Sequence, residues 1–360
     1  MDVAVEFRGV SKSYGRAVIV QDLNLSIYAN TFTVIFGAPA CGKSTVLRLL
    51  TGLDKPDHGE IWMRGQNVTR AAPGQRNIGY VPQSFALYPH YSVFDNIAYP
   101  LKLMGVSTRD ATPVVQRAAE QLKISHLLGK KPDQLSGGEK QRVAIARGIV
   151  KNTNIFVLDD PLTGLDFKLR EQLFDDLRQM RAALGAAFIY TTSDALETLM
   201  LAERVSVLDA GRIVEVGELE TVYAQPQHVR TMKLLGFPEA NLFSGTLDGG
   251  LCRTPLFDFR AALVNGSAPT EVSVAVRPQD IVINPPAGGT LKTFPADIVL
   301  VEDIGGEMVV YLEAAGLPLT AVVRHSDIGD PSEGRTTAAI DPKRLFLYGP
   351  NGSSIGQGAH

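Results

Sequence analysis

The feature that most constrains the fold is a glycine-bounded loop between an apolar strand and a helix. Residues 31–36 read TFTVIF, a β-branched and aromatic run that is typical of a buried strand. Residues 37–44 follow as GAPACGKS, and residues 43–50 then carry apolar side chains at helical spacing. Strand, glycine-rich turn and helix in this order open a parallel α/β unit. The order therefore predicts an α/β fold.

The loop fits the pattern G-x-x-x-x-G-K-[ST]. Its glycines let the backbone curl until its N–H groups face a β-phosphate at the positive end of the following helix. In this pattern Lys43 bridges the β- and γ-phosphates and Ser44 binds Mg²⁺. The predicted nucleotide-binding residues here are Gly37, Ala38, Pro39, Ala40, Cys41, Gly42, Lys43, Ser44 and Thr45. The pattern predicts a phosphate-loop NTPase that uses Mg²⁺.

Cys41 lies inside this loop, next to the helix N-terminus. That setting lowers the pKa of a thiol, so a reactive thiolate is expected. The alternative is a small, buried loop residue.

Asp159 is the candidate for the second half of the metal site. It ends the apolar run 155–158 (IFVL), and a carboxylate at the end of a buried strand suits a Mg²⁺-bound water. A helix or turn cap is the alternative. A further buried strand is expected at residues 187–190, after an amphipathic helix that Gly185 ends.

The class of NTPase depends on residues 135–142, which read LSGGEKQR. This segment resembles the signature sequence of ATP-binding-cassette proteins. Ser136 and the amides after it form an anion site at a helix start, and the same atoms also cap the helix. In the family this site serves the γ-phosphate of ATP held by the opposing subunit. The signature residues implied are Leu135, Ser136, Gly137, Gly138, Glu139 and Gln141.

Three more residues take family roles from their order along the chain. Tyr14 matches the aromatic that stacks on adenine, and Gln83 matches the glutamine that senses Mg²⁺ and the attacking water. Asp166 matches the loop that crosses between paired subunits. Taken alone, they would be a partly buried tyrosine, a turn residue and a helix N-cap.

The resemblance extends to the sugar-importer ATPases over nearly the whole chain. Residues 85–103 and 160–170 are similar to theirs, and residues 276–281 and 301–307 fit the pattern of their C-terminal regulatory domain. The family couples to transmembrane subunits through the segment that is here about 84–103.

This resemblance and the alternating strands after residue 271 predict the domain organisation. We expect a cassette domain over 1–235, with a helical subdomain at about 84–150. A small β-rich, OB-like regulatory domain follows over 236–349. The Gly- and Ser-rich segment 350–360 is expected to be a disordered tail.

Two positions depart from the family. Asp160 stands where the family usually has the glutamate that polarises the attacking water, and Ser193 stands in place of its histidine. Aspartate is one methylene shorter, about 1.5 Å of reach. A positioned base contributes ~10² to 10⁴ in rate, so this site is predicted to bind ATP well and hydrolyse it poorly. The alternative is a mild lesion, with Asp160 acting through an extra water.

The intact signature implies which partners the chain has. We expect a second, different cassette ATPase that supplies the glutamate and the histidine, two transmembrane permease subunits and, indirectly, an extracytoplasmic solute-binding protein. Some importers of glycerol and polyols that resemble this family use two different ATPase chains. A solute of this kind is therefore suggested for this chain. Alternatives are a sugar-importer homodimer, an ATP-binding regulatory module, and a soluble cassette protein of translation or DNA repair. A phosphate-loop kinase would leave LSGGE without a role.

Composition sets the remaining expectations. The formal net charge of −3 does not suggest a nucleic-acid binder, and two distant cysteines fit a reducing cytoplasm. The first residues do not resemble a signal peptide, and no apolar run is long enough to span a bilayer. Together with these observations, the resemblance implies a peripheral protein at the cytoplasmic face of the inner membrane, held there by its partners.

Overall fold

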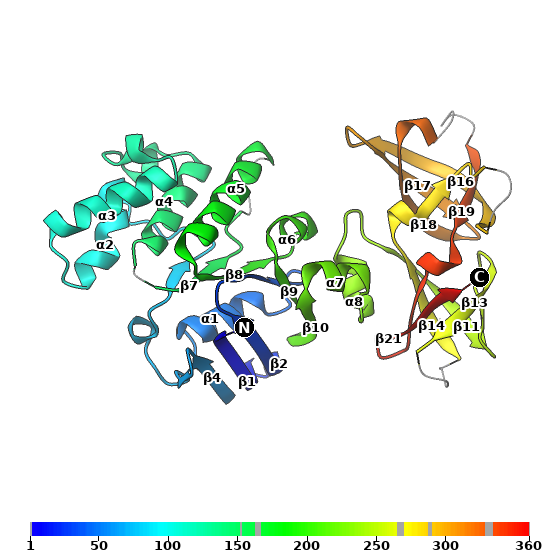
Figure 1. Ribbon diagram of the computed structural model, residues 1–360, viewed down its shortest axis with the longest axis horizontal. Coiled ribbons are helices and arrows are strands. Elements are labelled where there is room, and N and C mark those ends of the chain that lie inside the picture. Colours follow the sequence, from blue (N-terminus) through cyan, green and yellow to red (C-terminus); the bar gives the residue numbers. More distant parts are fainter. Residues whose placement is uncertain are drawn as a thin grey trace. The chain divides into compact units, whose positions relative to one another are not determined.

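The computed structural model describes residues 2–151, 153–162, 167–264, 270–286, 290–327 and 334–359. The chain divides into two compact units, Met1–Leu219 and Glu220–His360. The first combines helices with two sheets and the second is mainly β (Figure 1). The predicted fold class, an α/β cassette followed by a β-rich domain, is confirmed. Within the described ranges no helix combines the length and apolar character that a bilayer crossing requires.

A six-stranded, mainly parallel sheet forms the centre of the first unit. Its order is β10-β9-β3-β8-β7-β6, and only β10, at one edge, runs antiparallel to its neighbour. The bounds are β3 Phe32–Phe36, β6 Gly79–Val81, β7 Ile155–Asp159, β8 Ala187–Thr192, β9 Arg204–Asp209 and β10 Arg212–Glu218. All residues of β3, β7 and β8 are buried. Burial on both faces explains why these strands read as continuous apolar runs.

Three helices accompany the strands of this sheet. They are α1 Lys43–Thr51, α5 Phe167–Leu184 and α6 Ala195–Leu201. The helix predicted before Gly185 is α5, and Gly185 has a φ of 55°. Glycine adopts that left-handed conformation without a steric penalty, so it ends the helix.

A second, antiparallel sheet has the order β2-β1-β4-β5. Its strands are β1 Val3–Tyr14, β2 Ala17–Tyr28, β4 His58–Met63 and β5 Gln66–Asn67. In this sheet the alternation of apolar and charged residues that is typical of a strand is limited to residues 3–7. Beyond Phe7 the register of β1 against β2 shifts repeatedly, and such bulges break the alternation on which pattern reading depends. Buried side chains of β1, β2, β4 and α1 form one apolar cluster.

The helical lobe consists of α2 Val93–Leu103, α3 Thr108–Gln121 and α4 Gly137–Ile149. A serine hydroxyl caps the start of each helix, at Ser92, Ser107 and Ser136. These helices fall in the range expected for the helical subdomain. The lobe is tied to α5 by a buried ion pair between Arg142 and Asp176.

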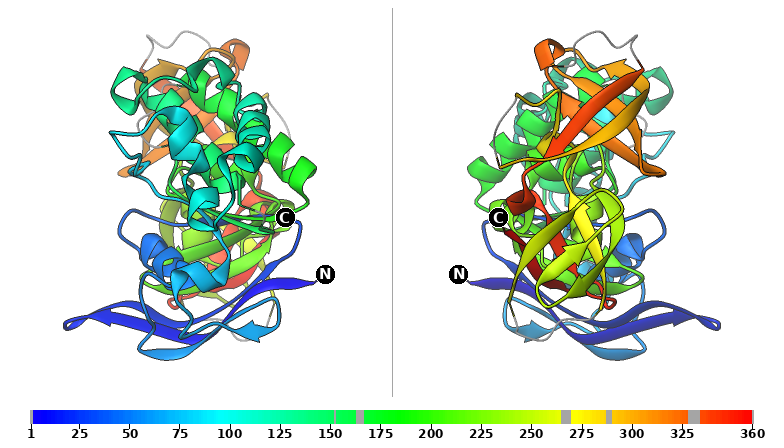
Figure 2. Two further views of the ribbon diagram at one scale, coloured as in Figure 1. Left: turned by 90° about the vertical axis from the view of Figure 1, so that its left-hand side faces the viewer. Right: turned by 90° about the vertical axis from the view of Figure 1, so that its right-hand side faces the viewer.

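The second unit combines a closed barrel with a five-stranded sheet, as the right-hand view of Figure 2 shows. The barrel order is β11-β12-β13-β21-β20-β14 and the sheet order is β15-β19-β16-β17-β18. The bounds are β11 Asn241–Asp248, β12 Leu251–Arg253, β13 Asp258–Leu263, β14 Glu271–Val276, β15 Ile281–Ile283, β16 Lys292–Asp303, β17 Met308–Ala314, β18 Leu317–Val323, β19 Arg335–Ile340, β20 Phe346–Tyr348 and β21 Ser354–Ala359. One apolar cluster contains buried residues from both.

The second unit begins earlier than the sequence suggested. Helices α7 Leu219–Ala224 and α8 Val229–Leu234 precede the expected boundary at 235/236, but the division lies at 219/220. The Arg277 guanidinium donates hydrogen bonds to the carbonyls of Tyr223 (2.7 Å) and Leu235 (2.8 Å). The Tyr348 hydroxyl donates to the carbonyl of Pro226 at 3.0 Å. The change in composition along the chain shows where the strands of the second unit begin. It does not show that the two preceding helices already pack with that unit.

The expected disordered tail is also wrong for most of its length. Residues Ser354–Ala359 form β21, which pairs with β13 and β20 and completes the barrel. A Cβ added to Gly356 would lie 2.3 Å from the carbonyl oxygen of Ala262, and one added to Gly358 would lie 2.0 Å from that of Pro342. These glycines allow close backbone packing, which composition alone does not distinguish from flexibility.

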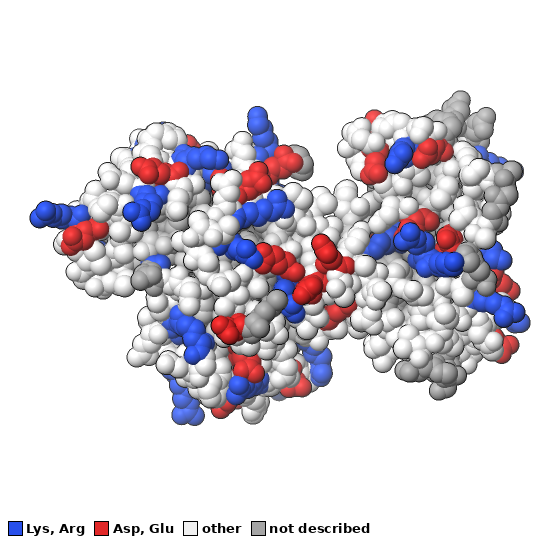
Figure 3. All heavy atoms as spheres, in the orientation of Figure 1, with Lys and Arg blue, Asp and Glu red and all other residues white. Residues whose placement is uncertain are grey.

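Acidic and basic side chains are interspersed over the face shown in Figure 3. Attraction of a charged ligand to this face therefore depends on local groups more than on a broad field.

Candidate nucleotide site

A cavity of about 320 Å³ lies at the carboxyl ends of β7 and β8, over the loop that follows β3. Ligands of open α/β sheets bind at this edge. The lining residues come from separate segments of the first unit: Ile19, Pro39, Ala40, Gly42, Lys43, Ser44, Thr45, Gln83, Asp159, Asp160 and Ser193. Ten of these eleven were singled out from the sequence, and the structure brings them together. Gly37, Ala38 and Cys41 belong to the same loop but do not line the cavity.

The loop conformation depends on its two glycines. Gly42 has a φ of 111° and caps α1, and Ala40 is also left-handed with a φ of 62°. A Cβ on Gly37 would lie 2.2 Å from the carbonyl oxygen of Leu208, so no larger residue fits without a shift. The N-terminus of α1 therefore opens onto the cavity, where helix N–H groups attract anions.

Lys43 projects from the first turn of α1 and is only 9% exposed. Its Nζ donates hydrogen bonds to the carbonyl oxygens of Gly37 (2.7 Å) and Ala38 (2.9 Å). Neither acceptor is charged, so these bonds do not pair the ammonium with an anion. A phosphate that enters the cavity can therefore bind it.

Asp159 lies between two hydroxyl donors. Ser44 Oγ donates to its Oδ1 at 3.1 Å, and Thr191 Oγ1 donates to the same oxygen at 2.9 Å. Burial, with the neighbouring Asp159 charge, raises the pKa of Tyr80 to about 12, so this phenol stays protonated. Thr191 was missed from the sequence, because a threonine at the end of a β-branched strand carries no distinguishing signal.

The residues present fit Mg²⁺ bound together with a nucleotide. Among the described residues no three His, Cys, Asp or Glu side chains gather as a metal cluster. Mg²⁺ commonly takes one or two carboxylates and completes its shell with phosphates and water. Asp159, Ser44 and Gln83 would hold such an ion, which would neutralise charge on the phosphates.

Asp160 and Ser193 both line this cavity. The main chain of Asp160 has a φ of 44°, and its N–H donates to the carbonyl (3.1 Å) and the hydroxyl (3.2 Å) of Thr191. Gln83 Nε2 lies 3.5 Å from Asp160 Oδ2. These bonds hold the backbone of Asp160 in place. The length of its side chain alone therefore sets how far the carboxylate extends into the cavity.

The expected reactive thiolate at Cys41 is wrong. The side chain is buried, and burial raises the pKa of the thiol although the nearby Lys43 charge opposes the shift. Its sulfur lies 2.8 Å from where a Cβ on Gly37 would be, on the inner side of the loop. Desolvation outweighs the helix N-terminus here, which agrees with the alternative of a small buried loop residue.

Tyr14 lies at the end of the β1–β2 hairpin, outside the cavity lining. Its side chain is 45% exposed and its hydroxyl donates to Asp54. Its stacking on adenine stays a prediction. Asp166 lies outside the described residues.

The signature residues start α4 and do not line the cavity of their own chain. The Ser136 N–H donates to Glu139 Oε2 at 2.7 Å, and the Glu139 N–H donates to Ser136 Oγ at 3.3 Å. The bond from Ser136 lowers the pKa of Glu139. A Cβ on Gly138 would lie 2.0 Å from the side chain of Leu169, so this glycine lets α4 approach α5.

Leu135 and Gln141 are buried, and neither amide atom of Gln141 has a hydrogen-bond partner among the described residues. The helix start is thus capped by its own residues, and it lies outside the lining of the chain's own nucleotide cavity.

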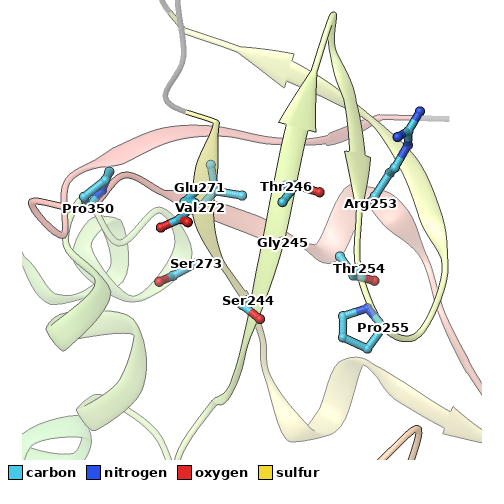
Figure 4. A pocket seen from close by; sticks show the side chains of 10 residues that line it. All are labelled: Ser244, Gly245, Thr246, Arg253, Thr254, Pro255, Glu271, Val272, Ser273 and Pro350. Carbon is cyan, nitrogen blue, oxygen red and sulfur yellow. The ribbon is translucent and has the colours of Figure 1, made fainter.

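A larger cavity, of about 680 Å³, lies on the outer face of the barrel (Figure 4). Glu271, Thr246 and Arg253 form one row across β14, β11 and β12, with the two charged residues on opposite sides of Thr246. The lining is mainly short hydroxyl side chains and prolines, and no metal-ligating cluster occurs there among the described residues. The smaller cavity is therefore the better candidate for chemistry.

Comparisons with known proteins show which family the chain resembles. The family model described as ABC transporter matches residues 20–163. The maltose/maltodextrin import ATP-binding protein MalK of Salmonella typhi is 34% identical over 364 residues, which cover 98% of this chain and 97% of MalK. MalK of Yersinia pestis bv. Antiqua is 34% identical over 359 residues, covering 97% and 96%.

Two solved structures resemble part of the chain. The ATP-binding cassette MJ0796, solved as a dimer bound to ADP and Pi, is 28% identical with a TM-score of 0.56, covering 60% of this chain and 98% of that one. The cbiO1 protein of Clostridium perfringens is 26% identical with a TM-score of 0.58, covering 62% and 92%. The chain belongs to the ABC transporter family, as a MalK-like ATPase.

Proposed function

We propose that this chain is the ATP-binding subunit of an importer for a carbohydrate or polyol, with a weak hydrolysis site of its own. In this account it binds MgATP through Lys43, Ser44 and Asp159. Its signature completes the site of a second cassette, which supplies the catalytic glutamate and histidine. The full-length similarity to maltose/maltodextrin import proteins supports sugar import, and the polyol is a narrower suggestion.

The observation that carries the proposal is a complete binding loop beside two altered catalytic positions. Lys43, Ser44, Asp159 and Gln83 line one cavity together with Asp160 and Ser193. Because Thr191 holds the backbone of Asp160, the short carboxylate cannot gain reach through a small main-chain shift. A general base that lies beyond hydrogen-bond distance of the attacking water loses most of its contribution to the rate.

The helical lobe offers a surface for transmembrane subunits. A cavity of about 270 Å³ there is lined by Tyr91, Phe94, Asp95, Ala98, Tyr99, Lys102, Val106, Thr108 and Ala111. Leu103 and Met104, beside it, are 71% and 59% exposed. Exposed apolar side chains around a cavity are typical of protein-docking sites. Docking here would place the chain on the cytoplasmic face of the membrane.

The test is to measure binding and hydrolysis separately on the purified chain. We expect MgATP to bind with ordinary affinity and to turn over slowly. Lys43→Ala is expected to abolish binding, because it removes the cation of the loop. Lys55→Ala is the matched control, since Lys55 is exposed and has no hydrogen bond or ion pair among the described residues. Unchanged binding by Lys43→Ala would refute the assigned site, and rapid turnover by the wild-type chain would refute the weak-site account.

A further inference from the structure

Arg147, in the last turn of α4, reaches back to the segment that follows Gln83. Its Nη1 donates to the carbonyl oxygen of Ala86 and its Nη2 donates to that of Phe85, both at 2.7 Å. The guanidinium carbon also lies 5.8 Å from the centre of the Tyr88 ring. Burial lowers the pKa of Arg147, so the desolvated cation depends on these acceptors.

The two carbonyls belong to an unfavourable piece of backbone. Phe85 and Ala86 are both left-handed, with φ values of 59° and 46°. Residues with a Cβ avoid this region, and a bulky side chain such as phenylalanine is rare there. The turn is tight as well, because the Phe85 N–H donates to the Pro82 carbonyl at 3.1 Å. An external contact is needed to maintain such a turn.

The position of Arg147 also connects two functional regions. The helix that carries it begins after the signature serine, Ser136. Beyond the turn, Tyr88 packs against Tyr91 (5.4 Å between ring centres) and Tyr99 (4.6 Å), which both line the cavity of the helical lobe. One arginine therefore contacts the backbone after Gln83 and the ring of Tyr88, and Tyr88 packs in turn against two tyrosines that line the cavity of the helical lobe.

We infer that Arg147 is a positioning residue for ATP hydrolysis. Its two hydrogen bonds hold the left-handed turn at Phe85 and Ala86. This turn then positions Gln83 beside Asp160. Movement of α4 is passed through the same bonds to Gln83 and to Tyr88. The inference rests on the ATPase activity of the family, and not on the proposed weakness of this chain's own site.

The first test is hydrogen exchange in the full chain. Arg147→Met should speed amide exchange in residues 84–91 by roughly tenfold, because the turn loses its external support. Exchange in α1 should stay as in the wild type. Arg147→Lys should give an intermediate rate, since a lysine cannot fork to two carbonyls. Arg117→Met is the matched control, because Arg117 is exposed on the same lobe and has no partner among the described residues.

The second test uses the backbone itself. Arg147→Met should lower kcat for ATP hydrolysis by roughly tenfold with a smaller change in KM, because Lys43, Ser44 and Asp159 still hold MgATP when Gln83 is displaced. Adding Ala86→Gly should recover most of the exchange protection and of kcat, since glycine adopts positive φ without the penalty. Ala86 is exposed, so this change removes little packing.

The exchange result is independent of how fast the chain hydrolyses ATP. Unchanged exchange in residues 84–91 of Arg147→Met would overturn the inference. The inference would also be overturned if Arg147→Met with Ala86→Gly exchanged its amides as fast as Arg147→Met alone. That result would mean that Arg147 acts only through packing.

Discussion

At the residue scale, we propose that Asp160 and Ser193 make this chain a weaker ATPase than its relatives. The structure places both in the cavity of the phosphate loop, and Thr191 holds the main chain of Asp160 through its hydroxyl and carbonyl. The missing reach then equals one methylene, about 1.5 Å. At this scale the account depends on side-chain length, and it can be tested by restoring that length.

Asp160→Glu combined with Ser193→His is expected to raise ATP hydrolysis by the purified chain roughly 10- to 100-fold. MgATP affinity should stay within about twofold, because the binding loop is untouched. Steady-state ATPase assays and nucleotide titrations measure the two quantities. Asp133→Glu, an exposed Asp-to-Glu change away from the cavity, is the control. No increase in the double variant would mean that other parts of the site limit hydrolysis.

The buried thiol of Cys41 gives a pH-dependent prediction. Since burial raises its pKa above the ordinary 9.0, the thiolate fraction at pH 7 is smaller than that of a free thiol. Alkylation of Cys41 should therefore be slow at neutral pH, and should rise about tenfold per pH unit to pH 9 and beyond. Mass spectrometry of the alkylated chain measures this, with the buried Cys252, of pKa about 11, as the internal comparison. A rate that levels off below pH 8 would contradict the inward orientation of the thiol.

At the scale of elements, continuous apolar runs were enough to predict the central strands and the loop between them. Strands β3, β7 and β8 are buried on both faces, so their composition alone identifies them. The full length of β1 could not be read, because its register shifts break the alternation. The role of Thr191 depends on two strands lying side by side, which no local pattern contains.

The barrel shows the opposite error, in which glycine content was taken for disorder. Gly358 lies in β21, where an added Cβ would be 2.0 Å from the backbone oxygen of Pro342. Gly358→Ala is expected to destabilise the second unit by about 1–3 kcal/mol, because backbone atoms cannot move aside cheaply.

Urea unfolding followed by a probe in that unit measures this change. Gly306→Ala is the control, since a Cβ there meets nothing within 4 Å. Equal stability of the two variants would favour the disordered tail that composition suggested.

At the scale of the whole molecule, we propose that the chain contributes to two different nucleotide sites. Its phosphate loop forms one cavity, and its signature helix starts elsewhere, outside that cavity's lining. The related cassette MJ0796 was solved as a dimer, and we propose that this chain also works in a pair. In a homodimer both sites would carry Asp160 and Ser193. A pair with a different cassette would contain one efficient site, completed by the signature of this chain.

The most direct test is transport-coupled ATP hydrolysis by the complex of this chain with its transmembrane subunits and a second cassette. Ser136→Arg should lower activity by roughly 10²-fold or more, because it fills the anion site that serves the partner's γ-phosphate. Asp160→Asn should change activity by less than about threefold, because that carboxylate contributes little as a base. Similar losses from both variants would contradict the account, and so would full activity of this chain with the transmembrane subunits alone.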